Sequence, residues 1–196
     1  NFVGMEDALT RVPLIIKPPA SQPARPGIRH ALTELIDLTE TVYAYAGIQP
    51  DYRRFGRDLR PLVSGEQPDQ LRDVVFCESG ISAGQPESHQ VPMAAMIEQR
   101  DEWDRPGPYW PGNHTYPLEE PFPVMGKVTM VRDQRYKLVL RLYAPDTFFD
   151  LQEDPMELRN LIDAPELQPE INRLRDRFMK WQWETDSTVP FTRDPR

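Results

Sequence analysis

The stretch that decides the fold is Phe149-Asp150-Leu151-Gln152-Glu153-Asp154-Pro155-Met156-Glu157-Leu158-Arg159-Asn160-Leu161. Asp154 can cap a turn that Pro155 begins, because proline is favoured at the first helical position. Glu157 then lies where a glutamate completes a capping box. Asn160 can close a turn through its side-chain amide. We therefore expect these residues to have architectural roles.

Two strand-like segments, 128–131 and 136–142, precede this stretch. The residues between them, Asp133-Gln-Arg135, form a compact connection that is typical of a hairpin. Residues 147–150 are expected to add a third strand, and residues 73–78 form another strand upstream. The sequence therefore predicts a small antiparallel sheet.

An amphipathic helix is predicted over residues 166–184, after the sheet. Apolar residues recur there at three- and four-residue spacing, which places them on one face of a helix. We expect this face to pack against the sheet. The stripe consists of Leu167, Ile171, Leu174, Phe178 and Trp181, with Met179 and Trp183 as the alternative members.

A different pattern opens the chain. Arg11-Val-Pro-Leu-Ile-Ile-Lys17 is a continuous apolar run, as in a strand buried on both faces of a parallel sheet. A helix follows over residues 38–46, where Asp37 and Glu40 fit an N-terminal capping arrangement and Gly47 supplies a left-handed stop. Its apolar face carries Leu38, Val42 and Tyr45. A strand followed by a helix is typical of an α/β sheet.

Composition excludes several functional classes. The 196 residues include 39% hydrophobic and 28% charged residues, as in a globular protein. The formal net charge is −8 and no Lys/Arg-rich block is present, which argues against a nucleic-acid partner. No apolar run approaches the roughly 20 residues that a membrane helix needs. Cys77 is the single cysteine, so no internal disulfide can form.

The region 79–125 is the hardest to assign. Residues 93–100 fit a short helix, and residues 103–123 are rich in Trp, Tyr, Pro and Gly, as in a long structured loop. Loops of this length in a compact domain are often functional. Trp110, His114 and Tyr116 are therefore our candidates for substrate binding at the mouth of an active site, although such aromatics more often only pack their own loop. The three histidines have no metal-ligand spacing.

Several segments, taken in order, resemble the C-terminal part of sulfatases of the alkaline-phosphatase superfamily. The region 79–125 is not covered by the resemblance, which ends at the closing motif quoted first. The segments are Arg11-Val-Pro-Leu-Ile-Ile, Leu35-Ile-Asp-Leu-Thr-Glu-Thr-Val with Ala46-Gly47-Ile48, Gly56-Arg-Asp-Leu with Pro61-Leu62 and Gly65, Val131-Arg132-Asp133 with Tyr136-Lys137-Leu138, and Phe149-Asp150-Leu151 with Asp154-Pro155, Glu157 and Asn160-Leu161.

The resemblance implies an α/β fold of which this chain is the C-terminal portion. Residues 1–65 would carry the last strand and helix of the large α/β domain. Residues 66–196 would form a C-terminal subdomain, with the antiparallel sheet, the long helix and the loop region 79–125. It also implies an exposed apolar surface around Val12–Ile16 unless a missing N-terminal catalytic part is bound.

The resemblance further implies a sulfuric ester hydrolase that acts on a small sulfated substrate. Its nucleophile would be a formylglycine made from Cys or Ser in a C-x-P-x-R-like motif, and calcium would be held by Asp and Asn or Gln side chains. Cys77 is followed by Glu-Ser-Gly-Ile and does not fit this motif. We therefore expect no catalytic residue and no bound cofactor in this chain, and no activity from the chain alone.

Two alternatives stay open at this point. A phosphodiester or phosphonate monoester hydrolase of the same superfamily would share the scaffold and change the chemistry. A non-catalytic binding or interaction module belongs to another class and would fold independently. The sequence leaves the compartment undecided, and it leaves a homo-oligomer open.

Overall fold

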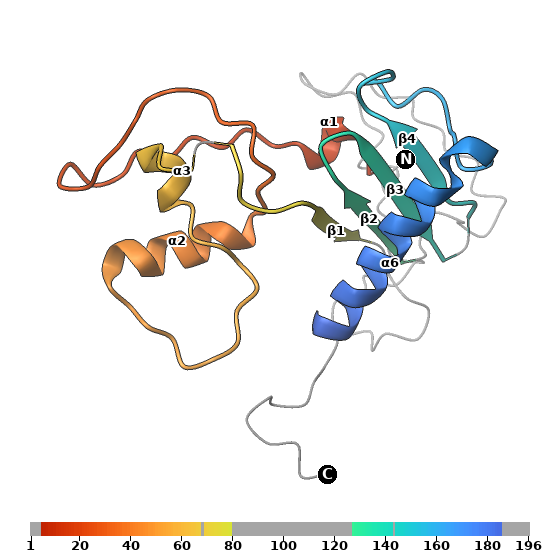
Figure 1. Ribbon diagram of the computed structural model, residues 1–196. Helices are drawn as coiled ribbons and strands as arrows, with labels where there is room; N and C mark the ends of the chain where they lie inside the picture. Colours follow the sequence, from red (N-terminus) through yellow and green to blue (C-terminus); the bar gives the residue numbers. More distant parts are fainter. Residues whose placement is uncertain (1–4, 68, 80–126, 143, 186–196) are drawn as a thin grey trace, which may run out of the picture.

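A computed structural model describes residues 5–67, 69–79, 127–142 and 144–185 (Figure 1). A sheet and a long helix form one part of the chain, and two shorter helices lie to the side of the sheet. The elements in chain order are α1 (Asp7–Thr10), α2 (Ile36–Ala46), α3 (Arg60–Ser64), β1 (Val75–Ser79), β2 (Val128–Arg132), β3 (Tyr136–Arg141), β4 (Thr147–Asp150), the 3₁₀ turn η2 (Pro165–Leu167) and α6 (Gln168–Thr185).

The sheet has four antiparallel strands in the order β1-β2-β3-β4. The predicted hairpin is confirmed, with Val131 of β2 opposite Leu138 of β3. Its turn is held by Asp133, whose Oδ1 accepts the backbone N–H groups of Arg135 and Tyr136 at 2.7 and 2.6 Å. The predicted strands at 73–78 and 147–150 are confirmed as β1 and β4.

One face of the sheet packs against α6 (Figure 1). Ile171 and Leu174 are fully buried there, and each such side chain contributes about 1.5 to 3 kcal/mol of hydrophobic stabilisation. Trp181 stacks on Phe76 of β1 with ring centroids 4.6 Å apart. The main predicted stripe is thus confirmed, whereas the alternative members Met179 and Trp183 are exposed.

The start of the chain packs against the second hydrophobic cluster of the sheet. Met5 is buried with Val128, Met130 and Val139, and these strand residues alternate with those that face α6. Cys77 packs against this cluster as a half-buried thiol and acts there as a small apolar side chain on a strand. Burial, followed by the nearby carboxylates, raises the pKa of the Cys77 thiol.

Helix α2 ends as predicted and begins differently. Gly47 has φ +68° and terminates the helix in the left-handed conformation. The helix begins at Ile36, so Asp37 lies in its first turn and is not the N-cap residue. Glu40 pairs with Arg54 instead of reaching back to the helix start. The capping arrangement predicted for Asp37 and Glu40 is therefore wrong, because both carboxylates have longer-range partners.

The strand predicted over residues 11–17 is wrong for the chain as described. Residues 12–17 form no strand and make no backbone hydrogen bond with any described residue. Ile15 is 93% exposed, and Val12 and Leu14 are exposed as well. An extended segment needs a neighbouring strand to satisfy its backbone, and no described strand lies against this one.

Of the three residues with predicted roles in the closing motif, Asp154 and Asn160 have the roles predicted and Glu157 does not. Asp154 Oδ2 accepts the N–H of Arg159 at 2.8 Å. Asn160 Oδ1 accepts the N–H groups of Phe148 and Ile162, which ties β4 to the chain that follows. The capping box at Glu157 is wrong, because no helix begins at residue 155 and the Glu157 carboxylate turns into the protein. The division of the chain at residue 65 stays a prediction.

Candidate functional site

The residues that the sequence nominated for substrate binding lie outside the described part of the chain. Trp110, His114 and Tyr116 fall within residues 80–126, as do the helix predicted at 93–100 and the long loop that follows it. Their role stays a prediction. His30 is exposed, and its backbone N–H donates to Asp69 Oδ1 at 3.1 Å.

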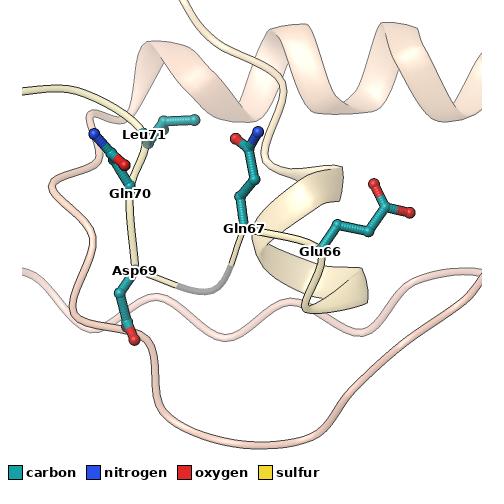
Figure 2. A pocket seen from close by; sticks show the side chains of 5 residues that line it. All are labelled: Glu66, Gln67, Asp69, Gln70 and Leu71. Carbon is teal, nitrogen blue, oxygen red and sulfur yellow. The ribbon is translucent and has the colours of Figure 1, made fainter.

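No metal centre is found among residues 5–67, 69–79, 127–142 and 144–185, where no three His, Cys, Asp or Glu side chains are grouped so as to hold an ion. A surface hollow of about 830 Å³ is lined by Glu66, Gln67, Asp69, Gln70 and Leu71. Figure 2 shows that the two carboxylates at this hollow point in different directions. Its lining offers neither a nucleophile nor a convergent set of polar groups, so we assign it no chemistry.

The most unusual group in the described chain is the ammonium of Lys137, which is fully buried in the sheet. Its Nζ donates to Met5 O at 2.9 Å, to Asp7 Oδ1 at 2.6 Å and to Glu157 Oε1 at 2.8 Å. Arg132 holds the other oxygen of Asp7 at 2.6 Å. All three donors of the ammonium are satisfied, which offsets the cost of burying its charge. We call these five residues the Lys137 junction.

Glu157 enters this junction from a left-handed backbone conformation. Its φ of +56° is the only positive value at a non-glycine residue in the described chain. Its Oε1 also accepts the N–H of Asp7 at 2.7 Å, which fixes the start of α1 beside the turn after β4. Its Oε2 is buried without a partner among the described residues. The junction is therefore held at a local cost in backbone strain and desolvation.

A second junction joins the start of α2 to the sheet. Asp37 is fully buried, and its two oxygens accept a bidentate pair from Arg72 at 2.5 and 2.8 Å. The same carboxylate accepts the N–H groups of Glu34 and Arg57, both at 2.7 Å. Glu34 in turn pairs with Arg72 and accepts the N–H of Phe76 in β1. We call these five residues the Asp37 junction.

One carboxyl group in each junction, Asp7 in the first and Glu34 in the second, has a shifted pKa, and the two shifts have opposite directions. Burial would raise the pKa of Asp7, but the hydrogen bond and charge of Lys137, together with Arg132, lower it below its ordinary value. Burial raises the pKa of Glu34 despite the N–H of Phe76 and the charge of Arg72. Both carboxyl groups are taken up by hydrogen bonds and ion pairs between segments that lie far apart in the sequence, so we assign them a role in holding those segments together.

Many of the exposed large apolar side chains lie in the N-terminal half of the chain. Helix α2 buries its polar residues Asp37 and Thr41 and exposes apolar ones, which is the reverse of a helix that packs on its own core. We call the exposed apolar residues of segments 12–15 and 35–42 the N-terminal apolar set. It consists of Val12, Leu14, Ile15, Leu35, Ile36 and Val42, all exposed. The surface that the sequence predicted around residues 12–16 is confirmed as exposed.

In the part of the chain that the structure covers, no helix combines the length and apolar character needed to cross a membrane. No protein-family profile matches the sequence.

Two curated relatives are similar over almost the whole chain. Human N-sulphoglucosamine sulphohydrolase is 27% identical over 202 aligned positions, which cover 90% of this chain and 37% of that protein. The multifunctional alkaline phosphatase superfamily protein PehA of Trinickia caryophylli is 21% identical and matches 92% of this chain and 30% of its own length. The chain therefore spans about a third of the length of these relatives.

Solved structures agree on the fold. A protein of Bacteroides thetaiotaomicron described as a sulfatase superposes with a TM-score of 0.54 at 21% identity, over 80% of this chain and 26% of its own. The phosphonate monoester hydrolase SpPMH of Silicibacter pomeroyi gives a TM-score of 0.52 at 26% identity, over 79% of this chain and 26% of its own. The chain is therefore similar in sequence to proteins named as a sulphohydrolase and as a member of the alkaline-phosphatase superfamily, and its fold matches the C-terminal portion of a sulfatase fold.

Proposed function

We propose that this chain is the non-catalytic C-terminal part of a sulfatase that hydrolyses sulfate esters. The observation that carries the proposal is the match of 90% of the chain to a curated sulfohydrolase of which it spans only 37%. The chemistry then belongs to an N-terminal catalytic part. A formylglycine residue in that part would supply the nucleophilic hydroxyl in its hydrated form, and a calcium ion held there would offset charge on the sulfuryl oxygens.

The work of the described chain is to brace that catalytic part. The Lys137 and Asp37 junctions fix α1 and α2 against the sheet. The segments that carry the N-terminal apolar set are therefore held in place before the catalytic part binds. Residues 12–17 belong to no helix or strand and make no backbone hydrogen bond with another described residue, which suits the addition of a strand to a partner sheet. We assign residues 1–65 to the large α/β domain on this basis, and residues 66–196 to the subdomain.

The region 79–125 shapes access to the substrate in this proposal. Trp110, His114 and Tyr116 offer aromatic faces and an imidazole, which are common in pockets that orient a small polar substrate. The substrate is a small sulfated molecule. The chain alone should have no activity, because the nucleophile and the metal ligands lie elsewhere.

The test is to produce the chain together with the polypeptide encoded in frame upstream of Asn1 and to assay the complex. An aryl sulfate and a matched aryl phosphonate monoester serve as paired substrates. We expect sulfate ester hydrolysis from the complex, none from either part alone, and a higher KM in a Trp110→Ala or His114→Ala variant. Trp183→Ala, on the exposed face of α6, is the matched control and should leave KM unchanged.

A phosphonate monoester hydrolase is the second candidate, and the 26% identity to the Silicibacter pomeroyi enzyme favours it specifically. Faster turnover of the phosphonate ester by the complex would replace the sulfatase proposal with this one. Binding of the upstream part with activity on neither ester would leave only an interaction module.

A further inference from the structure

The turn formed by residues 154–159, the Glu157 turn, has its polar residue inside and its apolar residues outside. The Glu157 side chain is 2% exposed. Its two neighbours are among the most exposed large apolar residues of the described chain, with Met156 at 74% and Leu158 at 84%. This arrangement depends on the φ of +56° at Glu157, which turns the carboxylate inward while its neighbours stay in solvent.

The Lys137 junction explains why Glu157 is buried, but it does not explain why Met156 and Leu158 are large and apolar. A buried ammonium needs an acceptor, and Glu157 Oε1 supplies one at 2.8 Å. Nothing in that requirement calls for large apolar residues on either side of the glutamate. Single exposed apolar residues are ordinary on protein surfaces, but a group of them on a rigid support marks a contact.

A third exposed apolar residue, Leu9, lies on the segment that this turn holds. Leu9 belongs to α1, whose first residue, Asp7, donates its N–H to Glu157 Oε1 at 2.7 Å. Helix α1 leads directly into residues 11–17, the first part of the N-terminal apolar set. The exposed residues around the Lys137 junction are thus joined by a few residues of chain to the surface already assigned to the catalytic part.

We propose that Leu9, Met156 and Leu158 form a second contact with the catalytic part, on the side of the Lys137 junction. The occupant is the same polypeptide that covers the N-terminal apolar set, so this inference rests on the proposed function. The relatives extend far beyond the matched third, and that length provides the covering surface. The buried ion pairs hold the turn rigid, so its side chains need little ordering when the parts associate.

Oxidation of methionine gives a direct measure of this contact. Dilute hydrogen peroxide converts exposed methionine to its sulfoxide, and each site can be followed by peptide mass spectrometry. In the chain alone Met156 should react readily. In the complex with the upstream polypeptide it should react at least about tenfold more slowly, because a covering surface blocks access.

The chain supplies its own controls for this experiment. Met179 is exposed on the outer face of α6 and should react at the same rate in both samples, while Met5 and Met130 are buried and should be slow in both. Equal rates at Met156 in the free chain and in the complex would overturn the inference.

Variants separate this contact from the proposed function. The double variant Met156→Ser, Leu158→Ser should weaken association with the upstream polypeptide by at least about tenfold without lowering the stability of the free chain. Ile15→Ser tests the proposed surface independently. Weakening by Ile15→Ser alone would sink the second contact and leave the proposed function standing. Absence of any complex with the unmodified chain would sink both.

Discussion

At the scale of single residues, Lys137 is the group on which stability should depend most. Its buried ammonium lies between the buried carboxylate of Glu157 and the partly exposed carboxylate of Asp7, so its removal leaves the Glu157 charge buried without its cation. We expect Lys137→Met to lower the free energy of unfolding by about 3 to 5 kcal/mol, measured by urea denaturation with circular dichroism.

A double variant tests that explanation. Lys137→Met combined with Glu157→Gln removes this buried charge and should recover part of the loss. Glu170→Gln, at the exposed i,i+3 pair with Arg173, is the matched control and should change stability by about 0.5 kcal/mol or less. A loss as small in Lys137→Met as in this control would contradict the importance of the junction.

Asp7 gives the junction a dependence on pH. The carboxyl has a folded-state pKa below its ordinary value of 3.8, so its stabilising effect is complete above that pH and disappears as the pH falls through the lowered value. Asp7→Asn should lower the free energy of unfolding by about 2 kcal/mol near neutral pH. The difference between the two proteins should shrink in acid, which urea titrations from pH about 5 to about 2 would reveal. A constant difference across that range would contradict the assigned ionisation.

Residue roles were predictable where the partners are close in sequence. Asp154 and Asn160 act within a few residues of their own positions, and turn chemistry predicted both. Lys137 and Asp37 were not found as centres of junctions, because their partners lie 130 and 35 residues away in sequence. A signal for Lys137 was present: strand alternation places it on the same face as the buried Val139.

At the scale of elements, α6 is the helix that covers one face of the sheet. Leu174→Ala removes a fully buried side chain from the cluster that joins α6 to β2 and β3, and should lower the free energy of unfolding by about 2 to 5 kcal/mol. Met179→Ala, on the exposed face of the same helix, should cost about 0.5 kcal/mol or less. Equal losses in the two variants, measured by thermal unfolding, would show that α6 does not pack as described.

The sequence predicted correctly the elements whose apolar residues pack against another described element. The hairpin, β4 and α6 form from residues adjacent in the chain, and they bury their apolar faces against one another. The segment predicted as a strand at 11–17 and Val42 on the apolar face of α2 follow equally clear patterns but stay exposed among the described residues. A pattern predicts which face of a segment is apolar, whereas its burial requires a second surface.

At the scale of the whole molecule, the free chain should behave as a folded domain with an uncovered surface. The N-terminal apolar set should bind a hydrophobic dye such as ANS. The double variant Ile15→Ser, Val42→Ser should roughly halve the dye signal while thermal unfolding stays unchanged. Trp183→Ser, exposed on α6, is the comparison for an isolated apolar residue. A free chain that does not bind the dye would argue against an uncovered docking surface.

The register of β1 with β2 has a consequence for how this chain can vary. Ser79 and Val128 are direct cross-strand partners, so the stretch between them leaves and re-enters the sheet at a single point. The entropy of closing such a loop grows slowly, by about 0.6 kcal/mol for each doubling of its length. Insertions, deletions or grafted sequences in this stretch should therefore leave the sheet intact. The sheet and α6 therefore form a scaffold that tolerates change between these two residues.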